Sequence, residues 1–219
     1  MLVEILGEEY NCHCPTTGRI GNVELKNIPC LCSVSKSLQR KTPYTVEAIS
    51  VDGKNWIGIN QILSNKLVEF FLKTNQLNSM ISNVESIKRE VKLGNSKLDF
   101  LVGNTYIEVK SPLTTLHVNY DSNIKEKKVT PFSSTDRFVK HIKELTDSLN
   151  LNERAILLTV YQYEITNRKE HQKSTNYDEV SYYVEQAIEK GLEMWELTIK
   201  FEKDGITLKT IENITNNMI

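Results

Sequence analysis

The sequence predicts an all-β module, residues 1–62, followed by an α/β module, residues 63–219. Two observations lead to this prediction. Short apolar runs separated by turn signals recur in the first 60 residues, which is typical of a small barrel or sandwich. After Ser64 the period changes, and helical patterns alternate with strand patterns. The expected order is therefore several strands, then α-β-β-α-β-α-β.

The N-terminal module is expected to contain four strands joined by turns. Asp52-Gly53 is a strong hairpin signal within it. A basic stretch, residues 36–41, lies between two of the strands. The expected strands are residues 2–6, 30–34, 44–51 and 56–59.

The C-terminal module is expected to alternate helices with buried strands. Ser64 is a plausible N-cap for the first helix, and Gly191 follows the last helix as a C-cap glycine does. Further helices are expected at residues 135–150 and 177–190. The expected strands are residues 87–93, 98–110, 154–163, 193–201 and 205–211.

Composition argues for a globular protein without a membrane segment. Charged residues make up 25% of the chain, and its apolar runs are far shorter than a membrane span. The N-terminus has no basic region of the signal-peptide type, so the expected location is cytoplasmic. Residues 84–143 carry a net charge of +4, whereas residues 144–219 carry −6. The basic middle can bind a polyanion locally, although a solvated surface would give the same pattern by chance.

The cysteines form two C-x-C pairs, Cys12 with Cys14 and Cys30 with Cys32. Common zinc sites use a different spacing, C-x₂-C. Free cysteine packs well as a small hydrophobic residue, so inert buried thiols are the first interpretation. A metal site or a disulfide on two neighbouring strands is the alternative. We expect no stoichiometric zinc.

One hairpin pattern carries the residues that point to chemistry. Two apolar runs flank Gly103-Asn104, which predicts a two-residue turn. Counting back from that turn places Asp99 opposite Glu108, where like charges roughly 4.5–5.5 Å apart repel. A divalent cation removes this repulsion because hard cations prefer oxygen ligands. Lys110 shares a face with Glu108 and can stabilise negative charge on a phosphate. A Glu-x-Lys pair on an exposed strand is the alternative interpretation.

The Asp…Glu-x-Lys pattern resembles the core of PD-(D/E)xK nucleases. From about residue 10 to about residue 200, the chain resembles the sugar fermentation stimulation protein A family. The resemblance rests on an ordered series of short blocks rather than on any single block. The blocks are His-Cys-Pro-Thr-Thr-Gly at 13–18, Arg-Lys-Thr-Pro-Tyr-Thr at 40–45, Lys-Leu-Asp-Phe-Leu at 97–101, Glu-Val-Lys-Ser at 108–111, and residues 65–69, 89–91, 135–137 and 140–141.

The resemblance implies an N-terminal OB-fold-like β-barrel and a C-terminal restriction-endonuclease-like α/β domain. It also implies nucleic-acid binding and Mg²⁺-dependent cleavage. This chain departs from the family in three places. Few residues precede the first block, so the first barrel strand is expected to be shortened or lost. Residues 131–134 lack the acid of the family's Phe-Pro-Asp-Ala block, and Lys97 replaces a usual arginine, which loses bidentate phosphate geometry.

The first hypothesis is therefore a nuclease that uses Mg²⁺ or Mn²⁺ to cleave DNA or RNA. Asp99 and Glu108 are the expected metal ligands, and Lys110 is the expected catalytic ammonium. Glu69 is carried as a third ligand because a helix acid completes the metal site in related nuclease folds. A solvated helix glutamate fits the pattern equally well. Phosphate contacts and base stacking are expected from Lys36, Arg40, Lys41 and Tyr44.

Three other residues are weaker candidates. Glu90 is an acid beside a strand, Gln162 is interpreted as a satisfied polar residue, and His141 as a residue at the edge of the core. Two other hypotheses stay open, namely a non-catalytic DNA-binding regulator of the same fold and a zinc-stabilised interaction module. The sequence also leaves open whether the protein forms a homodimer.

Overall fold

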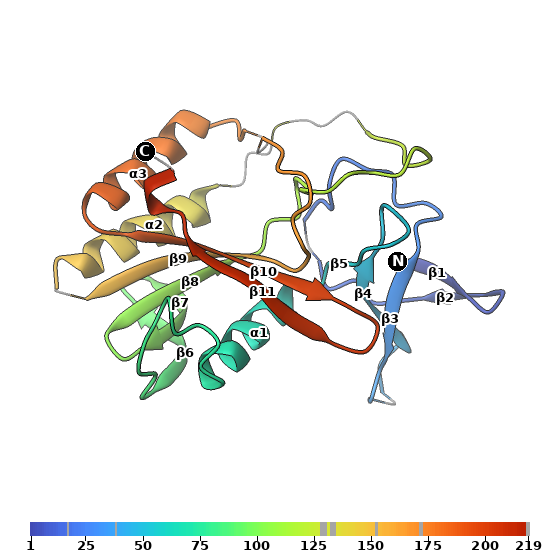
Figure 1. Ribbon diagram of the computed structural model, residues 1–219, viewed down its shortest axis with the longest axis horizontal. Helices are drawn as coiled ribbons and strands as arrows, with labels where there is room; N and C mark the ends of the chain where they lie inside the picture. Colours follow the sequence, from blue (N-terminus) through green and yellow to red (C-terminus); the bar gives the residue numbers. More distant parts are fainter. Residues whose placement is uncertain are drawn as a thin grey trace.

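A six-stranded mixed sheet forms the centre of the computed structural model (Figure 1). Its strand order is β11-β10-β9-β8-β7-β6, and only the β8–β9 and β9–β10 pairs are parallel. The strands are β6 (Ile87–Leu93), β7 (Ser96–Val102), β8 (Thr105–Lys110), β9 (Arg154–Tyr161), β10 (Glu193–Phe201) and β11 (Ile206–Asn213). The structure describes residues 1–16, 18–37, 39–127, 131, 135–151, 153–170 and 173–217. Most of the 131–134 block therefore lies outside the described residues.

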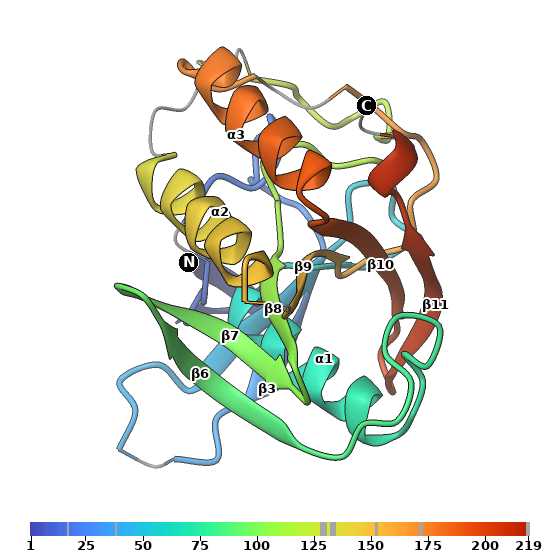
Figure 2. The same ribbon diagram turned by 90° about the vertical axis from the view of Figure 1, so that its left-hand side faces the viewer.

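Helices cover both faces of this sheet (Figure 2). Helix α1 (Gln61–Lys73) packs on one face, where its Val68 and Phe71 join Ile107 of β8 in one core. Helices α2 (Asp136–Leu149) and α3 (Tyr177–Glu189) lie side by side on the other face. Alternate side chains of β8 therefore point to opposite layers, because successive strand residues face opposite sides. None of the described helices is long and apolar enough to cross a membrane.

The N-terminal part contains the strands expected of an OB-fold-like barrel, but the barrel is not closed. Its strands form two separate sheets. The first is a hairpin of β1 (Leu2–Ile5) and β2 (Glu8–Asn11). The second has the order β3 (Cys30–Val34), β4 (Tyr44–Ile49) and β5 (Ile57–Gly58). The segment before the first family-like block is thus present as a short hairpin.

The two parts share a hydrophobic core. Residues of the N-terminal strands, such as Val46 and Ile57, pack with Leu116 and Tyr163 from the C-terminal part. The Gly58 amide also donates a hydrogen bond of 2.8 Å to the carbonyl of Gln162. The expected boundary near residue 62 therefore divides the sequence but does not divide this core.

The first helix begins earlier than predicted. Its N-cap position is Asn60, and Ser64 lies inside the helix, buried. The Ser64 hydroxyl instead accepts hydrogen bonds from Ser111 and Gln162 at 2.6 and 2.8 Å. The predicted cap at Ser64 is therefore wrong, because tertiary hydrogen bonds rather than a helix end satisfy this hydroxyl.

Candidate metal centre

The predicted hairpin is present, and its register is the one expected from the Gly103-Asn104 turn. Residues on β7 and β8 pair as Val102 with Thr105, Leu101 with Tyr106 and Phe100 with Ile107. The ladder stops there. One residue further along, the Asp99 side chain lies between the strands, and its Oδ2 accepts the Val109 amide hydrogen bond at 2.8 Å. The Asp99 carboxylate thus accepts the hydrogen bond of the Val109 amide, which the β7–β8 ladder leaves free.

Helix α1 also holds Asp99 in place. Its Oδ1 accepts a hydrogen bond of 2.6 Å from Asn65 Nδ2 on α1. Burial raises the pKa of Asp99, and the negative charge of Glu108 raises it further, against the hydrogen bonds from Val109 and Asn65. The negative charge of Glu108 therefore acts on Asp99, although the strand pairing ends at Phe100 and Ile107 and does not include Asp99 opposite Glu108.

Glu108 points into the α2 layer and is only 3% exposed. Its Oε1 accepts a hydrogen bond of 2.7 Å from Lys110 Nζ and also contacts His141 Nδ1 on α2. Burial raises the pKa of Glu108, but the His141 and Lys110 contacts outweigh burial and hold the pKa below its ordinary value. Its other oxygen, Oε2, has no hydrogen-bond partner among the described residues.

This donor set fits a hard divalent cation. A buried carboxylate oxygen without a partner is costly. A cation would bind that oxygen and reduce the repulsion between the negative charges of Asp99 and Glu108. Among the described residues, no three His, Cys, Asp or Glu side chains gather into a metal-binding group. The chain thus offers two carboxylates, and the ion's remaining positions would fall to other oxygens, as is usual for Mg²⁺.

The structure does not bring Glu69 to this pair. Both of its oxygens are in ion pairs, with Lys73 Nζ at 2.6 Å and with Arg89 Nη1 at 3.1 Å. These contacts lower the pKa of Glu69, the Lys73 hydrogen bond most strongly. Asn65, one helical turn earlier, reaches Asp99 instead. Helix α1 therefore contributes an amide to the site rather than a third carboxylate.

Two weaker candidates also lie apart from the carboxylate pair. Glu90 is exposed and forms an ion pair of 3.5 Å with Lys97, which is also exposed. Gln162 donates hydrogen bonds to the Asn60 carbonyl at 2.7 Å and to the Ser64 hydroxyl at 2.8 Å. Gln162 thus links the end of β9 to the start of α1, but its Oε1 is buried without a hydrogen-bond partner among the described residues, so the expected satisfied residue is satisfied only at its donors.

His141 and Asn65 are site residues that the sequence interpretation missed. His141 is 4% exposed and touches Glu108 directly, so it belongs to the carboxylate cluster rather than to the edge of the core. The available signal was a histidine on the apolar face of a helix. Asn65 gave no comparable signal, because an asparagine in a helix is usually solvated.

The predicted nucleic-acid residues lie on β4 and on the loop before it. Lys36, Arg40 and Lys41 are exposed. The Arg40 guanidinium donates a hydrogen bond of 3.1 Å to the Thr45 hydroxyl. Tyr44 is half-buried and packs edge-on against Tyr10, with ring centroids 5.1 Å apart. Three cations are therefore accessible on this loop, while Tyr44 also supports the N-terminal core.

All four cysteines are free thiols. The sulfur atoms of Cys30 and Cys32 lie 3.9 Å apart, and Cys12 is buried. A β-bulge between Leu31 and Cys32 changes the register of this strand. Burial raises the pKa of Cys32 to about 12, and the neighbouring thiols add to the shift. The raised pKa of the Cys32 thiol fits the inert interpretation.

Two family models match the chain in succession. The model described as the SfsA N-terminal OB domain matches residues 1–59, and the sugar fermentation stimulation protein RE domain matches residues 62–205. A sugar fermentation stimulation protein homolog from Alcanivorax borkumensis is 32% identical over 196 residues, which cover 86% of this chain and 80% of the relative. A homolog from Synechococcus sp. (strain JA-3-3Ab) is 31% identical and covers 91% and 81%.

A solved structure has the same fold. It is the structure of Pyrococcus furiosus SfsA in complex with Ca²⁺, with a TM-score of 0.71 and 23% sequence identity. The match covers 96% of this chain and 87% of that protein. At this identity the likeness establishes the arrangement of the strands and helices.

Proposed function

Because this chain belongs to the sugar fermentation stimulation protein family, we propose that it is a divalent-metal-dependent nuclease with its metal centre on Asp99 and Glu108. The observation that carries the proposal is the buried Oε2 of Glu108, which has no hydrogen-bond partner among the described residues. Asp99 is the second carboxylate of the proposed centre, and the negative charge of Glu108 raises its pKa. The complex of the Pyrococcus furiosus protein with Ca²⁺ supports a divalent site in this fold.

Asp99 and Glu108 would hold Mg²⁺ or Mn²⁺. When bound, such an ion lowers the pKa of a coordinated water and acts as a Lewis acid toward a phosphoryl oxygen. Asn65 and the Val109 amide hold the Asp99 carboxylate in place, so its position does not depend on the ion. A site whose ligands are fixed in advance loses little entropy when it binds.

Lys110 supplies positive charge beside the carboxylates. Its Nζ is tied to Glu108 Oε1, and its side chain is 30% exposed, so it is both positioned and accessible. An ammonium there neutralises negative charge that develops on a phosphodiester during cleavage. The substrate is DNA or RNA, with Lys36, Arg40 and Lys41 contacting phosphates and Tyr44 available to a base.

A cleavage assay tests this function directly. Single- and double-stranded DNA and RNA are incubated with the protein in Mg²⁺, Mn²⁺ or EDTA. We expect products only with metal, a loss of activity by orders of magnitude in Asp99→Asn, and wild-type activity in the control Glu193→Gln. Full metal-dependent activity in Asp99→Asn would place the site elsewhere.

One observation favours a second candidate, a non-catalytic DNA-binding regulator. The Lys110 ammonium already compensates the charge of Glu108 without any metal, and His141 contacts the same oxygen. Such internal compensation would let the family fold persist without catalysis. A wild type that binds DNA yet cleaves nothing on the panel, with either metal, would select this candidate.

A further inference from the structure

His141 gives the metal centre a partner from a third element of the fold. It lies on α2, whereas Glu108 and Asp99 come from β8 and β7. Its neighbours Ile142 and Leu145 anchor the helix in the hydrophobic layer above the sheet. The imidazole is therefore held by the packing of a whole helix, which leaves it little freedom to move.

The contact of His141 fixes which oxygen of Glu108 stays free. His141 Nδ1 and Lys110 Nζ both lie against Oε1. A carboxylate with two donors on one oxygen cannot rotate without breaking both contacts. Oε2 is consequently held where it has no partner among the described residues. Because Glu108 is only 3% exposed, leaving Oε2 without a partner is costly unless a cation binds that oxygen.

We propose that His141 is a positioning residue that fixes the Glu108 carboxylate so that Oε2 is presented to the metal ion. This inference rests on the proposed metal centre and adds a residue to it. Carboxylates that bind metals are themselves hydrogen-bonded in proteins, and loss of such an outer partner typically weakens metal affinity 10- to 100-fold. His141 acts through Glu108 and does not itself touch the ion.

Substitutions at position 141 separate this role from simple helix packing. In His141→Asn, the amide nitrogen is attached at Cγ as Nδ1 is, so a donor can return to Glu108 Oε1. In His141→Gln, the amide lies one carbon further out and misses that position. His141→Leu removes the donor but keeps an apolar filler. Ser148→Ala serves as the matched control, because Ser148 is buried on the same helix and bonds only the Leu145 carbonyl among the described contacts.

The readout is Mn²⁺ affinity by isothermal titration calorimetry, without substrate, on variants whose folding is checked by circular dichroism. We expect about a 10- to 100-fold weaker affinity for His141→Leu and His141→Gln. We expect His141→Asn to stay within a few-fold of wild type, and Ser148→Ala to match it. Equal affinities for the Asn and Gln variants would overturn the positioning role, even if the Leu variant fails to fold.

The outcome is also separable from the proposed nuclease function. A wild type that binds Mn²⁺ but cleaves no nucleic acid, with His141→Gln weakened, would overturn the nuclease and uphold the role of His141. If the wild type cleaves nucleic acid and His141→Gln binds Mn²⁺ at wild-type affinity, the nuclease function stands and the positioning role of His141 is overturned.

Discussion

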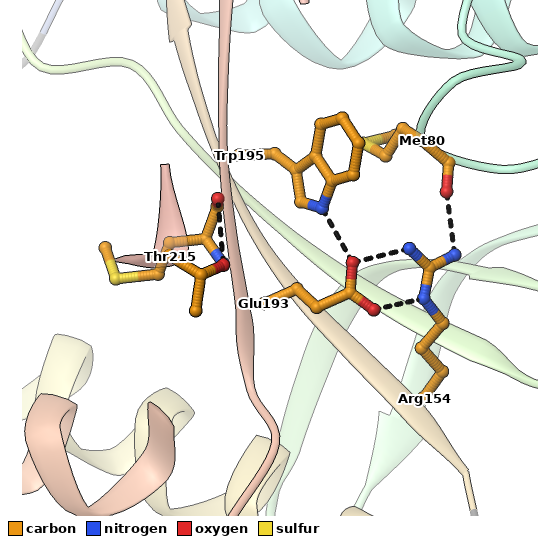
Figure 3. Close-up of polar contacts among 6 residues, drawn as sticks. Met80, Arg154, Glu193, Trp195 and Thr215 are labelled. Atoms are coloured by element: carbon orange, nitrogen blue, oxygen red, sulfur yellow. Dashed lines mark hydrogen bonds and ion pairs between the residues drawn. The ribbon is translucent and has the colours of Figure 1, made fainter. Parts of the chain in front are cut away.

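Glu193 and Glu108 are two carboxylates of the same sheet with different arrangements of donors. At Glu193, Arg154 binds both oxygens, and the Trp195 indole donates a further hydrogen bond of 2.8 Å (Figure 3). Arg154 also donates a bond of 2.7 Å to the Met80 carbonyl, which ties β9 and β10 to the loop after α1. Every oxygen of Glu193 therefore has a partner, as a purely structural ion pair should.

At Glu108 the donors are unevenly distributed. Lys110 and His141 share one oxygen, and the other has no partner among the described residues. The pKa values of Glu108 and Glu193 are both lowered, since charged or polar donors outweigh burial in each case. Charge state thus does not distinguish a structural carboxylate from a functional one here. The distribution of donors over the two oxygens does differ between Glu108 and Glu193, although Glu144 and Glu153 also have a buried oxygen without a partner among the described residues.

The largest expected difference between the two regions is in cleavage. Lys110→Ala removes the ammonium beside Glu108, and we expect cleavage to fall about 10²- to 10³-fold because one stabilising donor is lost. Mn²⁺ binding should stay close to wild type, since an ammonium cannot be a ligand. Lys143→Ala is the control, because this lysine of α2 lies over the Tyr183 ring of α3. Equal loss in both variants would remove Lys110 from the mechanism.

For stability we expect the opposite order, with the larger loss at Glu193 and the smaller loss at Glu108. Glu193→Gln leaves Arg154 without its carboxylate, which costs 3–5 kcal/mol for a fully buried pair. Because both side chains are a quarter to a third exposed, we expect about 1–3 kcal/mol in the free energy of unfolding. Glu108→Gln should cost less, since it also removes repulsion with Asp99. Urea unfolding of the metal-free proteins measures both, and a larger loss in Glu108→Gln would contradict the comparison.

The basic loop before β4 should affect nucleic-acid binding rather than stability. Replacing Arg40 and Lys41 with alanine should reduce the slope of log affinity against log salt by up to about two, because each phosphate contact releases close to one counterion. The exposed lysines Lys203 and Lys209 provide a control pair. A slope unchanged by the Arg40 and Lys41 substitutions would show that this loop faces away from nucleic acid.

The smallest expected effect is the pH dependence of Asp99. Its pKa is raised in the folded protein, so folding favours the protonated form, and stability falls as pH rises from the ordinary pKa through the raised one. Asp99→Asn lacks this loss. In EDTA, the unfolding free energy of Asp99→Asn relative to wild type should therefore increase with pH across that window. A decrease would mean that Asp99 is stabilised as a carboxylate.

The sequence predicted the parts of the site that local geometry determines. The Gly103-Asn104 turn fixes the hairpin register, so the three pairs nearest the turn followed from counting residues, whereas the predicted pairing of Asp99 with Glu108 lies beyond the end of the ladder. His141 and Asn65 reach the carboxylates from helices distant in sequence, and their docking depends on packing that no local pattern encodes. For the same reason Glu69 was expected at the metal, although Arg89 of β6 reaches it first.

The fold shows the same division. All six strands of the large sheet were expected within a few residues, because their apolar runs or their alternation of apolar and polar residues are typical of strands. The β2 strand was not expected, since Glu8, Glu9 and Asn11 give it a polar composition. It forms by pairing with β1 across the two-residue Leu6-Gly7 turn, where φ is +54° at Leu6 and +85° at Gly7.

Mn²⁺ titration of matched glutamine variants tests most directly whether the free oxygen of Glu108 marks a metal site. Wild type, Glu108→Gln and Glu193→Gln are titrated by calorimetry under identical conditions, with folding confirmed for each. We expect one Mn²⁺ site in the wild type, its loss in Glu108→Gln and its retention in Glu193→Gln. Wild-type Mn²⁺ affinity in Glu108→Gln would contradict the assignment of the metal centre.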